Sequence, residues 1–466
     1  MQGGTFMKVI IIGCTHAGLT AAKEILTNHP ETELTIYERN NNFSFSSDGI
    51  FLYLKNQVKN LESIFTSSPS KIRQMGALVR DMHTVLNVDT QKKQIRAVDM
   101  QKGIIITDNY DKLIVATGAN PRLPAIVGID NSRVLLCKSF LQAQKIYTMA
   151  QSSQRIAIIG AGYAGVEFAE SFAQKGYQVD LFQSSDQVLN NYFDVSTSEF
   201  VVKLLQKHHV NVHLNTNVTA FTEVTDLIIK LSTSSGDDFL EDMAIVCTGF
   251  IPNTRLFAKQ LKMEKHGALL LNNYLQTSDP DVYAAGDCAV VHFNPTNKSI
   301  YAPLGTNAVR QGFLVSKNIY GNFYPYMGTQ TTSALKLFGH NFAMTGLTLK
   351  NAKLHGLNAH STVYQGNWRP DYMPYSEPAT LSLVYNRDNR KILGLQLHSK
   401  KDLTQSVNTV SLAIQNSNTI DDLSMTDMFF QPNFDQPFNY LNIVAQTAVK
   451  HEKAAGFDNP RFTTLY

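Results

Sequence analysis

The chain contains few cysteines, and their positions argue against two kinds of site. Only four occur among its 466 residues, Cys14, Cys137, Cys247 and Cys288, and none belongs to a C-x-x-C pair. Such wide spacing argues against a disulfide scaffold and against a structural zinc site, so no bound metal is expected. Isolated thiols are typical of reducing compartments, and we therefore expect a cytoplasmic protein.

Charge and long apolar runs are scarce as well. Charged residues make up 17% of the chain, and the net charge is +3. Because there is no basic run or patch, a nucleic-acid partner is not expected. No apolar segment is long enough to cross a bilayer, so no membrane partner is expected either. The apolar start, V-I-I-I-G at 9–13, is better explained as a buried strand entering a glycine turn than as a signal peptide.

What is present is a strand–turn–helix–strand pattern that occurs twice. A β-rich run at 8–12 leads into the turn G-C-T-H-A-G at 13–18, then into helical sequence at 19–27 and a strand at 33–37. The same order returns with a strand at 155–159, the turn G-A-G-Y-A-G at 160–165, a helix at 166–174 and a strand at 178–182. Two such units, in a chain too long for one core, predict an α/β protein with two Rossmann-like dinucleotide-binding domains.

The first turn matches the dinucleotide-binding pattern only in part. Glycine is needed where the chain bends sharply and where its backbone approaches a pyrophosphate. Gly13 and Gly18 fill two such positions, Thr15 replaces the middle glycine, and Ala17 completes the turn. Glu38 ends the next strand at the distance expected of a carboxylate that binds a ribose diol. The alternative is a tight strand–helix turn without a ligand.

The second turn is a complete match, with Gly160, Gly162 and Gly165 in place. Its second strand ends at Gln183 instead of at an acidic residue, so the ribose would meet a neutral amide. No arginine or lysine follows in Q-S-S-D to bind a 2′-phosphate. This site therefore favours NADH over NADPH.

Three further stretches end strands at glycine, and the character of the chain then changes. They are A-T-G at Ala116, Thr117 and Gly118, T-G at Thr248 and Gly249, and A-A-G-D, which ends at Gly286 and Asp287. Beyond Tyr326, strands at 381–385 and 392–397 flank a turn, and helices are expected at 404–416 and 419–425. This part is predicted to form a third, α+β domain.

The order of these motifs resembles that of the pyridine nucleotide–disulfide oxidoreductases. In that family the aspartate of the G-D motif, here Asp287, binds the ribityl chain of FAD. The turn at 13–18, Y-E-R-N at 37–40 and F-F-Q-P-N-F-D-Q-P-F-N at 429–439 resemble the branch of NADH oxidases, NADH peroxidases and coenzyme A-disulfide reductases. The resemblance implies FAD and NADH as cofactors and a homodimer formed through the C-terminal domain.

The resemblance also implies how the domains divide and which further residues face the cofactors. It predicts a discontinuous FAD domain at 1–120 and 253–328, an NAD domain at 121–252 and a dimerisation domain at 329–466. In the family, a tyrosine at the position of Tyr163 lies over the flavin and moves aside for nicotinamide. Arg39 falls in the first cofactor site, and Thr306 begins a helix whose N-terminus would face the flavin ring and stabilise its reduced, anionic form.

One position departs from the family pattern in a way that matters for the chemistry. The family's single redox cysteine lies in S-F-L-S-C-G, whereas this chain has S-F-S-S-D-G at 44–49, with Asp48 at the cysteine position. A carboxylate forms no sulfenic acid and exchanges no disulfide, so chemistry that depends on that cysteine should be lost. His16 matches the family's active-site histidine, and a pair with Asp48 would favour its charged form. Protonated His16 would then assist release of peroxide.

We therefore expect an FAD-dependent NADH oxidase that passes electrons directly to oxygen and forms hydrogen peroxide. Two alternatives remain open at this stage. One is a flavin-dependent reductase of another small acceptor, such as a quinone, with Asp48 shaping its pocket. The other is a non-catalytic FAD-binding sensor. His16 and Asp48 also have simpler explanations, as a helix-start residue and as half of an Asp-Gly turn.

Overall fold

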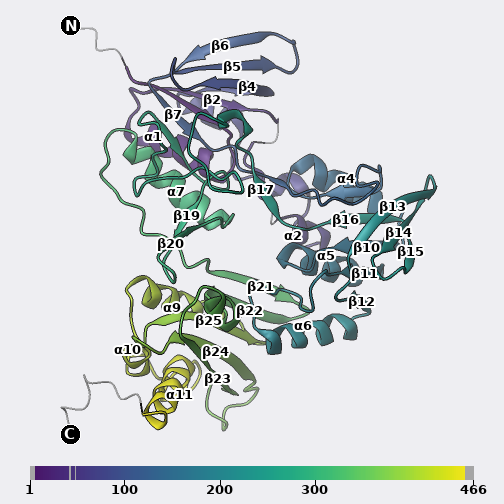
Figure 1. Cartoon of the computed structure of the whole chain (residues 1–466), viewed down its shortest axis with the longest axis vertical. Coiled ribbons are helices and arrows are strands. Elements are labelled where there is room, and N and C mark those ends of the chain that lie inside the picture. Colours follow the sequence, from purple (N-terminus) through teal and green to yellow (C-terminus); the bar gives the residue numbers. More distant parts are fainter. Residues whose placement is uncertain (1–5, 41–42, 48, 457–466) are drawn as a thin grey trace.

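The computed structural model describes residues 6–40, 43–47 and 49–456, so Asp48 lies outside the described residues. Three bodies follow one another in Figure 1, and the chain returns to the first of them after building the second. The mixed α/β architecture with two parallel sheets and a C-terminal α+β part confirms the predicted fold class. Within the described residues, no helix combines the length and apolar character that a membrane span needs.

The first body is built on a five-stranded parallel sheet of order β18-β7-β1-β2-β3. Its strands are β1 (Lys8–Ile12), β2 (Glu33–Glu38), β3 (Leu78–Asp81), β7 (Lys112–Val115) and β18 (Val282–Ala284). Helices α1 (His16–Asn28) and α7 (Gly305–Asn318) pack on the sheet, and a β-meander, β4 (His83–Asp89), β5 (Gln94–Asp99) and β6 (Ile105–Asn109), lies beside it. Strand interiors such as Val9 and Ile11 are fully buried, as expected for a parallel sheet covered on both faces.

The second body repeats this plan with a parallel sheet of order β12-β11-β10-β16-β9. Its strands are β9 (Val134–Leu136), β10 (Arg155–Ile159), β11 (Gln178–Phe182), β12 (Val210–His213) and β16 (Met243–Val246). The helices are α4 (Phe140–Ala150), α5 (Tyr163–Ala173) and α6 (Val195–Lys207), and a meander of β13 (Val218–Thr225), β14 (Ile228–Thr233) and β15 (Asp238–Glu241) covers the sheet. The chain crosses between the two bodies at β8 (Ala119–Pro121) and β17 (Phe250–Pro252), which pair antiparallel.

The third body is a five-stranded antiparallel sheet with helices on both of its faces. Its order is β21-β22-β25-β24-β23, with β21 (Ser333–Leu337), β22 (His340–Gly346), β23 (Ala359–Asn367), β24 (Pro378–Asn386) and β25 (Ile392–Ser399). Its helices are α8 (Leu349–Leu354), α9 (Ser406–Gln415), α10 (Ile420–Ser424) and α11 (Tyr440–Ala454). The predicted strand pair and helices of this region occur here. The predicted domain boundaries after residues 120, 252 and 328 stay a prediction.

Shorter elements complete the chain around the first two bodies. They are α2 (Gly49–Leu54), η1 (Leu61–Ile64), α3 (Pro69–Gln74), η2 (Arg255–Phe257), β19 (Val291–Phe293) and β20 (Lys298–Ile300). The two glycine-turn helices begin three residues earlier than the sequence pattern suggests, at His16 and Tyr163. The last glycine of each turn, Gly18 and Gly165, therefore lies inside the first turn of its helix.

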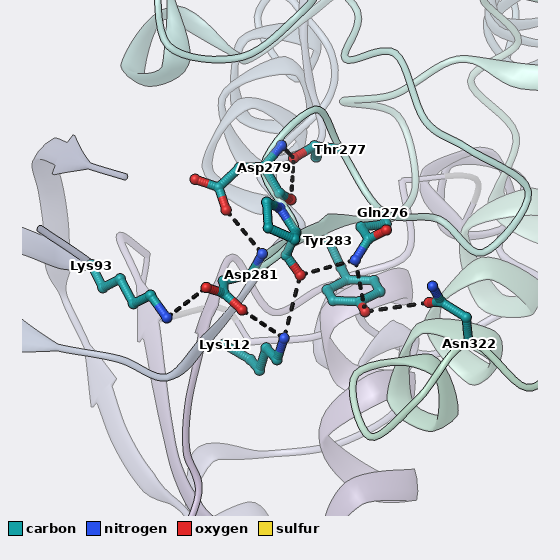
Figure 2. Close-up of polar contacts among 9 residues, drawn as sticks. Lys93, Lys112, Gln276, Thr277, Asp279, Asp281, Tyr283 and Asn322 are labelled. Atoms are coloured by element: carbon teal, nitrogen blue, oxygen red, sulfur yellow. Dashed lines mark hydrogen bonds and ion pairs between the residues drawn. The ribbon is translucent and has the colours of Figure 1, made fainter. Parts of the chain in front are cut away.

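A cluster of ion pairs joins the two separate segments of the first body (Figure 2). Asp281, which precedes β18, bonds Lys112 Nζ of β7 at 2.6 Å and Lys93 Nζ of the β4–β5 turn at 2.5 Å. Burial alone would raise the pKa of the Asp281 carboxyl, but the two ammonium groups hold it below its usual value. Because Lys112 and Asp281 come from the two ends of the interruption, the pairs hold the returning strand in the sheet.

A second cluster of polar side chains lies inside the second body, called the nucleotide body below because it carries the complete dinucleotide-binding turn, between its sheet and its meander. Glu241 at the end of β15 is only 2% exposed, and its Oε2 has no hydrogen-bond partner among the described residues. Burial, and then the charge of the nearby buried Asp180, raise the pKa of Glu241 to about 8. Asp180 itself bonds His213 Nε2 at 2.7 Å. The raised pKa therefore favours the protonated, neutral form of Glu241 near neutral pH.

We predict that Glu241→Gln raises stability most at alkaline pH. The pKa of Glu241 in the folded protein lies above the ordinary value of 4.5. Its contribution to the free energy of unfolding is therefore fully present below pH 4.5, and it is lost as pH rises towards 8 because the buried carboxyl then ionises. Glutamine has no charge to lose, and the variant should gain roughly 2–4 kcal/mol over the parent above pH 8. Thermal unfolding from pH 5 to 9 measures the difference. Asp238→Asn, an exposed change in the same strand, is the control; equal gains at all pH values would refute the assignment.

Candidate functional site

One large cavity, of about 1250 Å³, contains both glycine turns. Of the predicted site residues, those that line it are Gly13, Thr15, His16, Ala17, Glu38, Arg39, Ala116, Thr117, Gly118, Gly160, Gly162, Tyr163, Gln183, Gly249, Gly286 and Asp287. Gly18 and Gly165 lie behind the turns, and Thr306 is not among the lining residues although its neighbour Gly305 is. The structure thus brings together residues from 13 to 287 that sequence spacing alone could not place in one site.

In the first turn, glycine is required by close backbone contacts. A Cβ on Gly13, whose φ is +94°, would lie 2.3 Å from the carbonyl oxygen of Ala116. A Cβ on Gly18 would lie 2.0 Å from the carbonyl oxygen of Gly13, so the helix could not approach the strand. The Glu38 carboxylate at the end of β2 accepts hydrogen bonds from the backbone N–H of Cys14 at 2.8 Å and of Asn40 at 3.0 Å. This places an acidic group beside the turn, where a ribose diol would lie.

The second turn has the same construction with one open position. Cβ atoms on Gly160 and Gly165 would lie 2.6 and 1.8 Å from the carbonyl oxygens of Cys247 and Gly160. By contrast, a Cβ on Gly162 would meet nothing within 4 Å. Gln183 occupies the place that Glu38 has in the first turn, and its Oε1 accepts from the N–H of Ala161 at 3.0 Å. Its amide donates to Ser185 Oγ at 2.7 Å and to the Gln187 carbonyl at 3.2 Å.

These features fit dinucleotides at both turns. Gly162 leaves the space that a pyrophosphate needs directly over the N-terminus of α5, where unpaired backbone N–H groups favour an anion. On the side of the first body, the hydroxyl of Tyr301 lines the cavity but is buried without a hydrogen-bond partner among the described residues. A buried hydroxyl is rarely left without a partner, and a polar cofactor group would supply one.

His16 lies at the first residue of α1 and faces the start of α7. A Cβ built on Gly305 would lie 3.8 Å from its Cδ2 and Nε2 atoms. The N-termini of two helices therefore meet at this imidazole, which is a polar corner of the cavity and not a solvent-exposed helix start. The suggested pair with Asp48 involves a position outside the described part of the chain, so it stays a prediction.

Sequence analysis missed Lys138, which follows β9. Its Nζ bonds Asp287 Oδ2 at 2.9 Å and lies 4.2 Å from the ring centre of Phe250. The lysine belongs to the nucleotide body and the aspartate to the first body, so the contact crosses the boundary between them at the cavity. No local pattern marks Lys138, since its partner is 149 residues away.

The third body also contributes to the cavity, which the sequence did not indicate. Met344, Leu347, Asn351 and His355 are among the lining residues. Tyr163 points to the same side, where its ring packs against that of Tyr192, with ring centres 4.1 Å apart and the planes tilted by 35°. Its hydroxyl is 2.8 Å from Ser333 Oγ of β21. Burial raises the pKa of Tyr163, so its hydroxyl stays protonated.

Three of the thiols in or near the cavity are held in the protonated form. Burial is the main cause that raises the pKa of Cys14, and the negative charge of the nearby Glu38 carboxylate raises it further. Burial also raises the pKa of Cys247, with a smaller effect from the neighbouring Cys137. For Cys288, burial and then the charge of Asp287 raise the pKa to about 11. A thiol in this form is a poor nucleophile. Among the described residues, no group of three or more histidine, cysteine and acidic side chains is placed to hold a metal ion.

This combination of two dinucleotide turns on parallel sheets and a C-terminal α+β body defines a two-site nucleotide oxidoreductase. Residues 7–312 match the family model for pyridine nucleotide-disulphide oxidoreductase, and residues 332–441 match the dimerisation domain of the same family. The chain belongs to the pyridine nucleotide-disulphide oxidoreductase family. It is therefore an FAD-dependent NAD(P)H oxidoreductase, as the motif order predicted.

Individual relatives indicate which branch of the family the chain resembles. The chain is 46% identical over 446 residues to an NADH oxidase of Enterococcus faecalis, covering 96% of this chain and 100% of that protein. It is similar to the structure of the water-forming NADH oxidase from Lactobacillus brevis bound to NADH, with a TM-score of 0.95, 44% identity and coverage of 97% and 100% of the two chains. It also resembles reduced CoADR-RHD of Bacillus anthracis, with a TM-score of 0.92, 25% identity and coverage of 98% and 82%. These similarities confirm the predicted branch of the family.

We predict that Gly162→Val weakens binding of the nicotinamide nucleotide without loosening the fold. The new side chain would enter the open space over the N-terminus of α5. The dissociation constant for NAD⁺, titrated into the FAD-loaded protein, should rise by at least about tenfold, which corresponds to 1.4 kcal/mol. FAD content and the unfolding temperature should stay unchanged.

Gly165→Ala provides the contrast, because its Cβ would collide with the backbone of Gly160. This variant should lose the folded nucleotide body along with binding. Normal NAD⁺ affinity in Gly162→Val would mean that the pyrophosphate does not lie at this turn.

Proposed function

We propose that the protein is an NADH oxidase that uses FAD to pass electrons from NADH to oxygen. The observation that carries the proposal is the cavity shared by both glycine turns, which supports two dinucleotide sites within reach of each other. The similarity to NADH oxidases over nearly the whole chain supports the same activity. When bound, FAD accepts a hydride from the nicotinamide and gives up electrons to an acceptor.

Different residues of the chain would bind the two cofactors. The first turn with Glu38 suits the adenosine half of FAD, and Asp287 with Lys138 suits the polar chain that leads to the flavin ring. The second turn suits the pyrophosphate of the nicotinamide nucleotide. We infer that His16, at the meeting point of two helix N-termini, gives or holds a proton near the reacting end.

NADH is the proposed nucleotide. The amide of Gln183 is fully occupied by Ala161, Ser185 and Gln187, which fixes the loop around the ribose position without a positive charge. From Gln183 to Tyr192 the chain has no lysine or arginine for a 2′-phosphate. Because NADH is made and used inside cells, the cytoplasm is the proposed compartment, which cell fractionation would test.

Hydrogen peroxide is the proposed product. Reduction of oxygen to water in this family depends on a redox cysteine, and Asp48 stands at that position in the sequence. The raised pKa values of Cys14, Cys247 and Cys288 make these thiols poor replacements. Electrons would then leave as peroxide after the first two-electron transfer to oxygen. The similarity to the water-forming NADH oxidase of Lactobacillus brevis supports the opposite expectation, that the product is water.

We predict close to one hydrogen peroxide formed per NADH consumed by the FAD-loaded protein in air-saturated buffer. Asp48→Cys should lower this ratio, because it restores a thiol at the family's position. Ser47→Cys, which adds a thiol one residue away on the cavity wall, is the control and should keep the ratio near one. NADH loss can be followed by absorbance and peroxide by a peroxidase-coupled dye.

A ratio near zero with rapid NADH loss would refute the proposed product but not the oxidase activity. If no NADH is consumed in air, the oxidase proposal fails. Bleaching of the flavin by NADH without oxygen would then indicate another acceptor, such as a quinone, and unchanged colour would indicate a binding protein.

A homodimer is the proposed assembly. The segment between α10 and α11 exposes Phe429, Phe434 and Phe438, which are 70%, 64% and 52% accessible. Contiguous exposed aromatic side chains are typical of a protein interface. The match of residues 332–441 to a dimerisation domain supports the same use of this body.

We predict that the double variant Phe434→Ser with Phe438→Ser is monomeric where the parent is a dimer. Removing two large apolar side chains from an interface core typically costs several kcal/mol of association energy. Light scattering coupled to size-exclusion chromatography gives the mass. Leu354→Ser, which changes an equally exposed apolar residue on α8, should leave the dimer intact. An unchanged mass in the double variant would place the interface elsewhere.

A further inference from the structure

Helix α5 connects the nucleotide site to a buried charge two turns away. Tyr163 and Glu167 of this helix line the cavity. Glu170 follows at the next position on the same face, because residues three and four apart share one side of a helix. It is 3% exposed. The helix that begins at the second glycine turn thus has a buried carboxylate just beyond the wall of the cavity.

Three parts of the chain meet at Glu170. Its carboxylate forms an ion pair with Lys55 Nζ, directly after α2, and the Lys55 side chain is only 11% exposed. The same carboxylate accepts the backbone N–H of Phe338, in the turn between β21 and β22. The side-chain amide of Gln174, the residue that caps the C-terminus of α5, donates to it at 3.2 Å. One carboxylate therefore joins α2, the nucleotide body and the third body.

Helix α2 belongs to the first body by sequence but to the nucleotide body by packing. Phe51 meets Phe168 of α5 edge to face, with ring centres 4.8 Å apart. Phe45, Ile50, Phe51 and Leu54 form one hydrophobic cluster with the interior of the nucleotide body. At its start, a Cβ on Gly49 would lie 2.2 Å from Ile64, so this end is closely packed as well.

This helix also forms part of the cavity wall. Phe45 and Ser47, which precede it, and Phe51 within it are lining residues. The wall is fastened at its far end by the Lys55–Glu170 pair. Breaking such a buried pair on one side leaves an unpaired charge, so the surrounding segments must move to let water in. The ion pair thus fixes the cavity wall relative to the helix that starts at the nucleotide turn.

We propose that Lys55 and Glu170 are positioning residues for hydride transfer. Their ion pair sets the distance between the cavity wall built by α2 and the nicotinamide nucleotide held at the start of α5. This inference rests on the proposed function as far as NADH donates a hydride in this cavity, but it does not depend on oxygen as the acceptor. Small misplacements of reacting groups are costly, since about 1 Å can reduce a rate by two orders of magnitude.

The test uses FAD-loaded Lys55→Met, Glu170→Gln and the double variant, mixed with NADH without oxygen in a stopped-flow instrument. In each variant the limiting rate of flavin bleaching should fall at least tenfold, while the dissociation constant for NADH stays within threefold of the parent. Hydrogen exchange of residues 49–55 should become faster in the same samples. Lys55→Arg, which keeps the charge, should recover most of the rate.

Lys175→Met is the matched control. Lys175 Nζ bonds Asn56 Oδ1 at 3.5 Å, so it links the ends of the same two helices, but at an exposed site. Its removal should change neither the bleaching rate nor the exchange of residues 49–55.

The double variant separates positioning from stability. It has no unpaired buried charge, so its unfolding temperature should recover relative to the single variants, whereas its bleaching rate should stay low. A bleaching rate that recovers together with the unfolding temperature would overturn the proposal. So would unchanged rates in all three variants. A parent protein that bleaches with NADH but consumes no oxygen would contradict the proposed acceptor and leave this test valid.

Discussion

The close approach of backbone to backbone at the two glycine turns is the constraint on which the site depends. At each turn a helix must lie so near its preceding strand that a single methyl group on Gly18 or Gly165 would collide with a carbonyl oxygen. Only then do the N–H groups at each helix start face the cavity, where they can bind an anion. The same construction serves both halves, and the difference between them lies in one residue, which ends β2 in the first half and directly follows β11 in the second. Glu38 brings a charge to the first site, and Gln183 brings a neutral, internally bonded amide to the second.

Polar contacts across the boundaries between bodies make one site from three parts. Lys138 of the nucleotide body holds Asp287 of the first body, and Ser333 of the third body holds the hydroxyl of Tyr163. Each contact joins residues more than a hundred positions apart and lies at the cavity or beside it. The geometry of electron transfer is therefore a property of how the bodies pack, and not of any one domain.

The fold and most of the predicted residues that line the cavity could be found from the sequence because they depend on local rules. Apolar runs, glycine spacing and strand-ending carboxylates act within about thirty residues of one another. The helix starts were misplaced by three residues because the last glycine of each turn is compatible with the helix and allows it to begin early. Lys138, Ser333 and Glu170 could not be found in this way, since each acts through a partner distant in sequence. His16 was recognised by resemblance alone, and its place beside Gly305 follows from the packing of α1 on α7.

The interrupted sheet of the first body has a consequence for how the chain is made. Strand β7 is bordered by β1 on one side and by β18 on the other, and β18 begins at Val282. A ribosome therefore releases the whole nucleotide body, with its contiguous sheet, before the last strand of the first sheet exists. Until then, one edge of β7 has no backbone partner, and Lys112 and Lys93 lack the carboxylate of Asp281. The nucleotide body can complete its folding on the ribosome, whereas the first body closes only when the chain returns to it.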